Sequence, residues 1–92
     1  MNRKDLVETM ARETGLTAGQ ADAALTAALD GVAAAVAAGE RVTLPGFGTF
    51  ERRSRAARTG RNPQTGEVLE IEASQAPAFK PAAAFKQAVA GR

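Results

Sequence analysis

The residues best suited to chemistry lie in one segment, RRSRAARTGRNPQTG, which spans residues 52–66. Apart from one proline, this segment has no apolar side chain larger than alanine, and it has no acidic residue. Arginine suits phosphate because its planar guanidinium offers paired donors and keeps its charge. A solvated loop is the usual explanation for isolated basic residues, but this density predicts binding to nucleic acid. The basic residues are Arg52, Arg53, Arg55, Arg58 and Arg61.

The charge of the chain is concentrated in this segment. The formal net charge of +2 is the sum of +5 in residues 52–66 and −3 in the remaining residues. The sequence pI of about 9.7 points in the same direction. A local positive field attracts polyanions even when the whole molecule is nearly neutral.

Pro63 lies among turn-forming pairs in the middle of this segment. A proline at a hairpin tip is ordinarily a turn device, because it fixes its own backbone and biases Asn62 toward extended geometry. An apolar, rigid ring surrounded by arginines also suits a wedge that unstacks and kinks duplex DNA. The local sequence leaves both interpretations open.

Other kinds of site find little support in the sequence. The chain has no Cys and no His, and its ten acidic residues are scattered, so we predict no catalytic residue, no metal site and no cofactor. Residues 46–48 read GFG but lack the further glycine and the following helix of a dinucleotide motif. Single-strand binding by aromatic stacking is disfavoured, because all four phenylalanines lie outside the basic segment. The protein is therefore not expected to be an enzyme.

The longest apolar run, residues 32–38, is far too short to span a bilayer. Asp5 and Glu8 fall where a signal peptide needs its apolar stretch. We therefore expect no membrane association and no export by that route, which fits a cytoplasmic protein.

The pattern predicts an α+β fold in the order helix, helix, three strands, helix. Asn2 and Gly15 suit the two ends of a first helix, and Thr17 with Gln20 forms a capping-box pair for a second helix that runs to Gly39. Strands are expected over residues 41–44, 49–55 and 66–73, with a final helix in residues 77–92 opened by Pro81 and closed by Gly91. In the third strand, alternation separates Leu69, Ile71 and Ala73 from Val68, Glu70 and Glu72.

Residues 53–70 are predicted to form a hairpin arm with its tip near Asn62 and Pro63. With the arm outside the core, about 75 residues remain to bury apolar surface, which is marginal for a monomer. Much of the second helix's apolar stripe is alanine, which buries little area. A second copy of the chain is the remaining way to complete the core.

The stretch from Leu44 to Glu67, LPGFGTFERRSRAARTGRNPQTGE, followed by PAFKP at residues 77–81, closely resembles the bacterial histone-like HU proteins and integration host factor. The similarity runs from Met1 to about Val89. The resemblance implies one domain over residues 1–92 that forms an intertwined dimer. Residues 1–39 would form its helical dimerisation part, residues 40–80 a three-stranded antiparallel saddle with protruding hairpin arms, and residues 81–91 a C-terminal helix.

The resemblance also implies roles for individual residues. Pro63 would be the intercalating wedge in the minor groove, with Asn62 and Gln64 beside it. Phe47, Phe50 and Phe79 would form the dimer core. The other DNA-binding residues would be Arg3, Arg52, Arg53, Arg55, Arg58, Arg61, Lys80 and Lys86.

The chain departs from the family pattern at several positions. Family members often carry lysine where this chain has Ala18, Gly19, Thr59 and Ala83. We therefore expect the arms to dominate binding, with a shallower salt dependence than a lysine-rich relative shows.

The expected function is architectural binding and bending of double-stranded DNA with little sequence preference, serving nucleoid compaction and organisation. Bent, nicked or distorted DNA should be preferred. The subunits would form a homodimer, with a heterodimer of paralogues as the alternative. Two competing functions stay open: a sequence-selective bender of the integration-host-factor type, and a binder of structured RNA or of an acidic protein.

Overall fold

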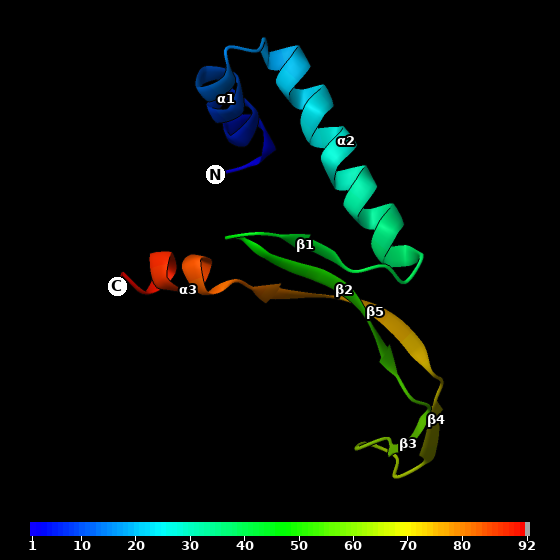
Figure 1. Cartoon of the computed structure of the whole chain (residues 1–92). Helices are drawn as coiled ribbons and strands as arrows, with labels where there is room; N and C mark the ends of the chain where they lie inside the picture. Colours follow the sequence, from blue (N-terminus) through cyan, green and yellow to red (C-terminus); the bar gives the residue numbers. More distant parts are fainter. Residues whose placement is uncertain (92) are drawn as a thin grey trace. The chain divides into compact units, whose positions relative to one another are not determined.

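The computed structural model describes residues 1–91, which form three helices and five strands. The chain divides into two compact units, Met1–Ala34 and Ala35–Arg92. The helix α2 begins in the first unit and ends in the second (Figure 1). The predicted α+β class is confirmed.

In the first unit, α1 (Arg3–Thr14) begins and ends at the predicted residues. The Asn2 side chain accepts a hydrogen bond from the Asp5 amide at 3.0 Å, and the Asp5 carboxylate accepts one from the Asn2 amide at 3.1 Å. Gly15 closes the helix with φ of 75°, a left-handed conformation that glycine adopts without steric strain. Both predicted caps are therefore confirmed.

The second helix, α2 (Ala18–Ala37), also starts at its predicted capping box. The Thr17 amide donates to Gln20 Oε1 at 3.0 Å, and the Gln20 amide donates to Thr17 Oγ1 at 3.1 Å. At the other end, the Gly39 amide donates to the Val36 carbonyl and the Glu40 amide donates to the Ala35 carbonyl. This double pairing, with Gly39 at φ of 88°, is the Schellman arrangement that ends many helices.

The second unit is built on a three-stranded antiparallel sheet with the order β1-β2-β5. Its strands are β1 (Val42–Leu44), β2 (Gly48–Arg55) and β5 (Ser74–Pro81). The pairing of β2 with β5 covers all eight residues of each strand, from Gly48 opposite Pro81 to Arg55 opposite Ser74. This long ladder fixes which side chains share a face of the sheet.

The predicted hairpin arm extends beyond this sheet as a second ladder (Figure 1). Its strands are β3 (Arg58–Arg61) and β4 (Val68–Ile71), paired from Arg58 opposite Ile71 to Arg61 opposite Val68. The connecting turn contains Pro63 and is held by the Asn62 amide, which donates to the Glu67 carbonyl at 2.8 Å. Residues 56–57 and 72–73 separate the arm from the sheet.

Two predictions about the last third of the chain are wrong. The strand expected over residues 66–73 covers only 68–71, and residues 74–81 form a further strand, β5, that was not predicted. The final helix, α3 (Ala83–Ala90), begins after Pro81, which ends β5 and does not open the helix. A proline-bearing strand is possible here because β5 lies at the edge of its sheet, where a missing amide donor need not break the ladder.

The apolar core within residues 1–91 is small. Its buried apolar side chains are Val7, Ala21 and Val36. The four phenylalanines of the second unit contact one another, with ring centroids 4.9 Å apart for Phe47 and Phe85 and 4.8 Å apart for Phe50 and Phe79. Phe47 nevertheless remains 45% exposed and Phe79 38% exposed. These rings form an apolar surface that the single chain does not cover.

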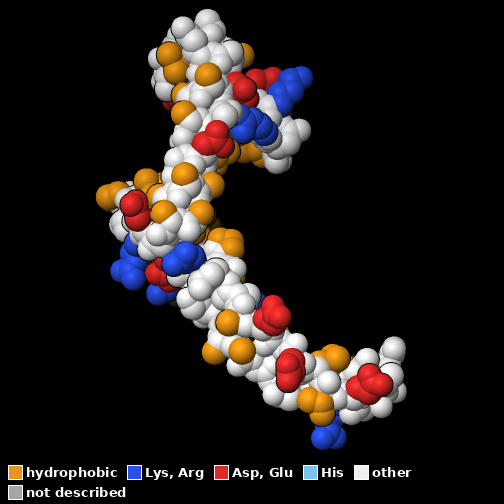
Figure 2. All heavy atoms as spheres, turned by 90° about the vertical axis from the view of Figure 1, so that its right-hand side faces the viewer, with side chains coloured by type: hydrophobic (Ala, Val, Ile, Leu, Met, Phe, Trp, Pro, Cys, Tyr) orange, Lys and Arg blue, Asp and Glu red, His pale blue; other side chains and the backbone are white. Residues whose placement is uncertain are grey.

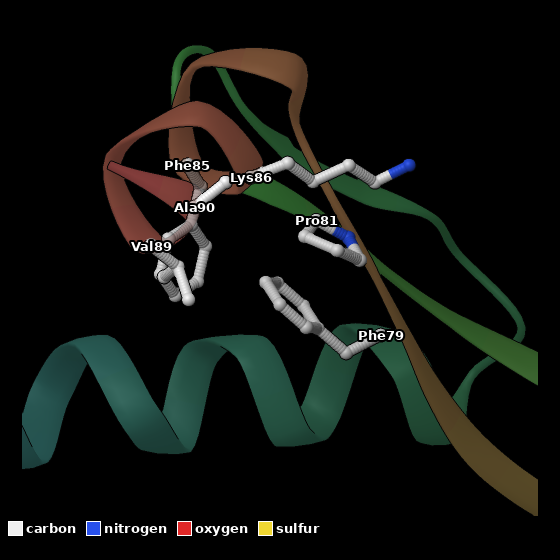
Figure 3. Close-up of a pocket in the computed structure, with 6 residues that line it drawn as sticks. All are labelled: Phe79, Pro81, Phe85, Lys86, Val89 and Ala90. Atoms are coloured by element: carbon white, nitrogen blue, oxygen red, sulfur yellow. The ribbon is translucent and has the colours of Figure 1, made fainter. Parts of the chain in front are cut away.

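Beside these rings, α3 and the end of β5 border a hollow (Figure 3). Apolar side chains form most of its wall, and Phe79 and Val89 point into it from β5 and α3. The apolar surface thus extends from the sheet onto α3. The lining residues are Phe79, Pro81, Phe85, Lys86, Val89 and Ala90.

Candidate nucleic-acid interface

The two faces of the three-stranded sheet differ in chemistry because side chains alternate along each strand. Along β2, Thr49, Glu51, Arg53 and Arg55 share one face, and Phe50 lies on the other, opposite Phe79 of β5. Lys80 is paired with Thr49, so it joins the polar face. One side of the sheet is therefore charged and the other is aromatic.

Glu51 stands at the centre of the charged face. Its carboxylate lies 3.1 Å from Lys80 Nζ, 3.4 Å from Arg41 Nε and 3.9 Å from Arg53 Nη2. The Glu51 side chain is only 15% exposed, whereas the three cationic side chains are each more than half exposed. The hydrogen bond from Lys80 lowers the pKa of Glu51, and the charges of Arg41 and Arg53 act in the same direction against the opposing effect of burial.

Arg52 points away from this cluster, on the opposite face of β2. Its Nη1 donates to the Ala37 carbonyl at 3.2 Å, and its guanidinium lies against Gly39, where a Cβ would come within 3.0 Å of Nη2. The last carbonyls of α2 lack intrahelical donors, and α2 has no basic residue in its last turn. Arg52 supplies both a donor and a positive charge to the end of α2.

The remaining arginines of the segment are free for a partner. Arg55 ends β2, and Arg58 and Arg61 lie at the two ends of β3. All three are exposed, and no ion pair to them occurs within residues 1–91. Arg58 and Arg61 lie on opposite faces of β3, because they are three positions apart along the strand.

The tip of the arm presents Pro63 and Gln64 to solvent. Asn62 is half-buried, and its side-chain oxygen accepts a hydrogen bond from the Gln64 amide at 2.9 Å. The Asn62 side chain therefore shapes the turn itself. Pro63 is held out at the end of the ladder with its ring exposed.

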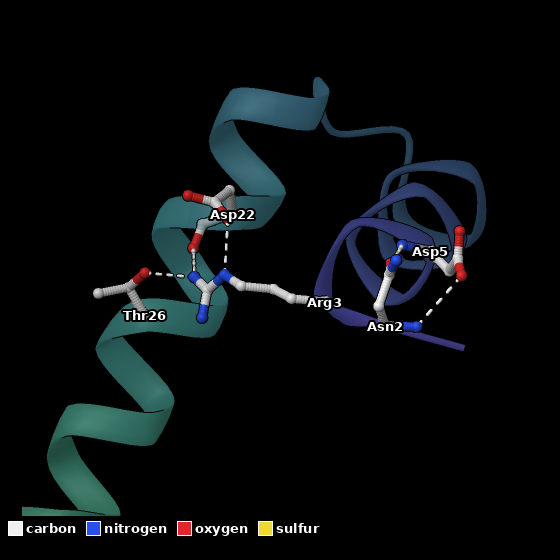
Figure 4. A network of polar contacts seen from close by, with 5 residues as sticks. All are labelled: Asn2, Arg3, Asp5, Asp22 and Thr26. Carbon is white, nitrogen blue, oxygen red and sulfur yellow. Dashed lines mark hydrogen bonds and ion pairs between the residues drawn. The ribbon is translucent and has the colours of Figure 1, made fainter.

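The predicted body residues belong to elements other than the arm. Arg3 is engaged within the first unit, where its Nε lies 3.0 Å from the Asp22 carboxylate and its guanidinium also donates to Thr26 Oγ1 (Figure 4). Lys86 lies on α3, with its ammonium extended away from the apolar hollow (Figure 3).

Within residues 1–91, no helix is both long and apolar enough to cross a membrane.

Comparisons with known proteins give this arrangement a family. The family described as bacterial DNA-binding protein matches residues 1–90. The chain belongs to the HU family. It is 51% identical over 89 residues to DNA-binding protein HU of Geobacillus stearothermophilus, covering 97% of this chain and 99% of that protein. It is 50% identical over 90 residues to DNA-binding protein HU of Nostoc, and the match covers 98% of this chain and 96% of that protein.

The HU fold is also found by comparison with solved structures. An Anabaena HU–DNA cocrystal structure matches with a TM-score of 0.90 and 49% identity, and the match covers 100% of both chains. The family consists of DNA-binding proteins and not of enzymes, so the expectation that this HU-family chain is no enzyme is confirmed.

The contacts of Glu51 and Arg52 could not be predicted from the sequence. Alternation along β2 indicates that Arg53 and Glu51 share a face, but the approach of Lys80 requires the register of a strand that was not predicted. The contact between Arg52 and the end of α2 likewise depends on a packing that no local pattern encodes.

Proposed function

We propose that this HU-family protein binds double-stranded DNA with its arms, bends it, and does so with little sequence preference. The observation that carries this proposal is the extended hairpin, whose exposed arginines have no ion-pair partner within residues 1–91. A ribbon of this kind can follow a groove and neutralise phosphates along it. The cocrystallised Anabaena relative supports DNA as the partner.

The proposed phosphate and groove contacts begin on the charged face of the sheet and continue onto the arm. Arg53 and Arg55 lead from the sheet to Arg58 and Arg61 on the arm. Asn62 and Gln64 flank the tip, and Arg3, Lys80 and Lys86 would meet DNA on either side of it. We leave Arg52 out of this set, because its guanidinium is used at the end of α2.

Pro63 is proposed as the wedge. Its ring is apolar, conformationally fixed and exposed at the end of the arm, which are the properties needed to enter between base pairs. Unstacking one step costs a few kcal/mol, and the longer contact along bent DNA offsets this. Because minor-groove contacts distinguish mainly A·T from G·C, flexible, nicked or distorted DNA should bind better than any fixed sequence.

The proposed functional unit is a homodimer. The uncovered phenylalanine surface and the small core both call for a second copy of the chain. Each chain would form one domain. Residues 1–39 would supply the helical dimerisation surface, residues 40–80 would form the sheet with its arm, and residues 81–91 would form the C-terminal helix. A heterodimer with a paralogue would use the same surface.

Two such arms on one duplex would bend and compact DNA, so we place the protein at the nucleoid. The test is energy transfer between the ends of a labelled duplex of about 35 base pairs, which is roughly 120 Å long at about 3.4 Å per base pair and so exceeds the reach of two arms of about 25 Å each. Two unrelated sequences and a nicked duplex are compared across a salt series. Similar affinity for both sequences, a large bend and tighter binding to the nicked duplex are expected.

Each other outcome favours a different function. Bending of only one sequence supports a site-selective bender, and absence of duplex binding supports structured RNA or an acidic protein as the ligand. Pro63→Ala is the matched variant for the wedge. It should reduce the bend angle more than the affinity, and an unchanged bend angle would remove Pro63 from the mechanism.

A further inference from the structure

The arm has two chemically different faces. In an antiparallel ladder, directly opposed residues lie on the same side, and the side alternates at each step. The observed register therefore puts Arg58, Gly60, Leu69 and Ile71 on one side, which we call the Leu69 face. The other side, the Glu70 face, carries Thr59, Arg61, Val68 and Glu70.

The Leu69 face is a strip of exposed apolar surface. Leu69 is 45% exposed and Ile71 is 42% exposed. Gly60, opposite Leu69, has no side chain to cover them, and the Ile71 Cδ1 atom lies 3.3 Å from the point where a Gly60 Cβ would stand. The ladder of β3 and β4 is a separate two-stranded sheet, so this strip is not part of the sheet core of its unit.

The charges indicate which side of the arm approaches DNA. Glu70 carries a negative charge on its own face, and acidic side chains recur along the visible side of the hairpin in Figure 2. A carboxylate turned toward phosphates would be repelled. The Leu69 face has no acidic residue among its four members, and it includes Arg58. Arg61 shares the Glu70 face in the last pair before the turn.

We infer that the arm enters the minor groove with its Leu69 face inward, so that Leu69 and Ile71 contact DNA and Glu70 faces solvent. The inference rests on the proposed function and names the contacting surface within it. The walls of the minor groove are largely deoxyribose C–H groups, so apolar side chains bury surface there without an unpaired polar atom. A ribose would place 2′-hydroxyls along the same walls, which makes this contact favour DNA over RNA.

Neighbouring residues provide a matched experiment. Leu69→Gln and Val68→Gln make the same replacement one residue apart, on opposite faces of β4. Loss of the apolar contact should weaken duplex affinity about tenfold for Leu69→Gln, whereas Val68→Gln should change it by less than about twofold. Equal effects of the two replacements, or the larger effect at Val68, would overturn the inference.

A second measurement guards against a hairpin that simply fails to form. The chain has no cysteine, so Leu69→Cys and Val68→Cys each introduce a single thiol whose labelling rate can be followed with and without duplex DNA. DNA should protect the thiol at position 69 and leave the one at 68 reactive, and equal protection at both positions would refute the orientation. If the unaltered protein binds no duplex at all, the proposed function itself fails. The affinity measurement on the unaltered protein shows this separately from the effects of the two replacements.

Discussion

Replacing Arg52 with alanine tests whether an arginine in the basic segment serves the fold and not the ligand. The substitution removes the hydrogen bond from Nη1 to the Ala37 carbonyl and the positive charge at the end of α2. The Schellman pairing already satisfies the Ala35 and Val36 carbonyls, so Ala37 is the carbonyl that loses its donor. We therefore expect Arg52→Ala to lower the free energy of unfolding.

The size of the effect follows from its two components. A cation near a helix C-terminus contributes about 0.3–1 kcal/mol, and a typical intramolecular hydrogen bond contributes about 0.5–1.5 kcal/mol. Because Arg52 is exposed, the lower part of each range applies, which gives a total of about 1 kcal/mol. In a domain of this size, that corresponds to a fall in Tm of roughly 4–8 °C.

Arg55→Ala is the matched control, because it removes the same charge from the same strand at a side chain without an ion pair in residues 1–91. Thermal unfolding by circular dichroism and the salt dependence of duplex affinity are measured for both variants. Arg52→Ala should lower Tm and keep the salt slope, whereas Arg55→Ala should keep Tm and reduce the slope by about 1 per arm. An unchanged Tm with a reduced slope for Arg52→Ala would refute the capping role.

Three further predictions follow from the packing and the charges. Gly48→Ala should lower the free energy of unfolding by about 1–3 kcal/mol, measured by denaturant unfolding, because the new Cβ would lie 2.5 Å from Phe79 Cε1 and 2.6 Å from the Lys80 carbonyl oxygen. A variant as stable as the unaltered chain would contradict the tight pairing of β2 with β5. Glu51→Gln should be less stable than the unaltered chain at pH 7, because the charged Glu51 carboxylate stabilises the fold, as its lowered pKa indicates. This difference in stability should shrink as the pH falls below 4.5, the ordinary pKa of a glutamate. A difference that grows with acidity would contradict a stabilising charge on Glu51. Finally, Tm should rise with protein concentration if a second copy covers the phenylalanines, whereas an obligate dimer is excluded if Tm is independent of concentration.

The first half of the fold could be predicted because its signals are local. Asn2 with Asp5, Gly15, and Thr17 with Gln20 each act within a few residues, and each forms the expected cap. The strand β5 could not be predicted in this way. Its prolines argue against a strand until the sheet order shows that β5 lies at an edge, and this order depends on pairing with residues 19 to 33 positions away, from Arg55 opposite Ser74 to Gly48 opposite Pro81.

The candidate interface was predictable in composition and less so in geometry. The arginines and Pro63 stand out in the sequence, and the turn at Asn62 forms where the turn-forming pairs predicted it. The separate environments of Arg52 and Arg53 were not foreseen, although alternation already assigns them to opposite faces. Which neighbour each one meets, Ala37 or Glu51, is determined by tertiary packing.

Residues 56–57 and 72–73, which separate the two ladders, affect how freely the arm changes its angle to the sheet. Pairing stops at Arg55 and Ser74 and resumes at Arg58 and Ile71, so both strands are interrupted at the same level. A ribbon without cross-strand hydrogen bonds at one level swivels there more readily than along its paired parts. We therefore expect the arm to tilt about residues 56–57 and 72–73, and complexes with different duplexes should show a spread of bend angles.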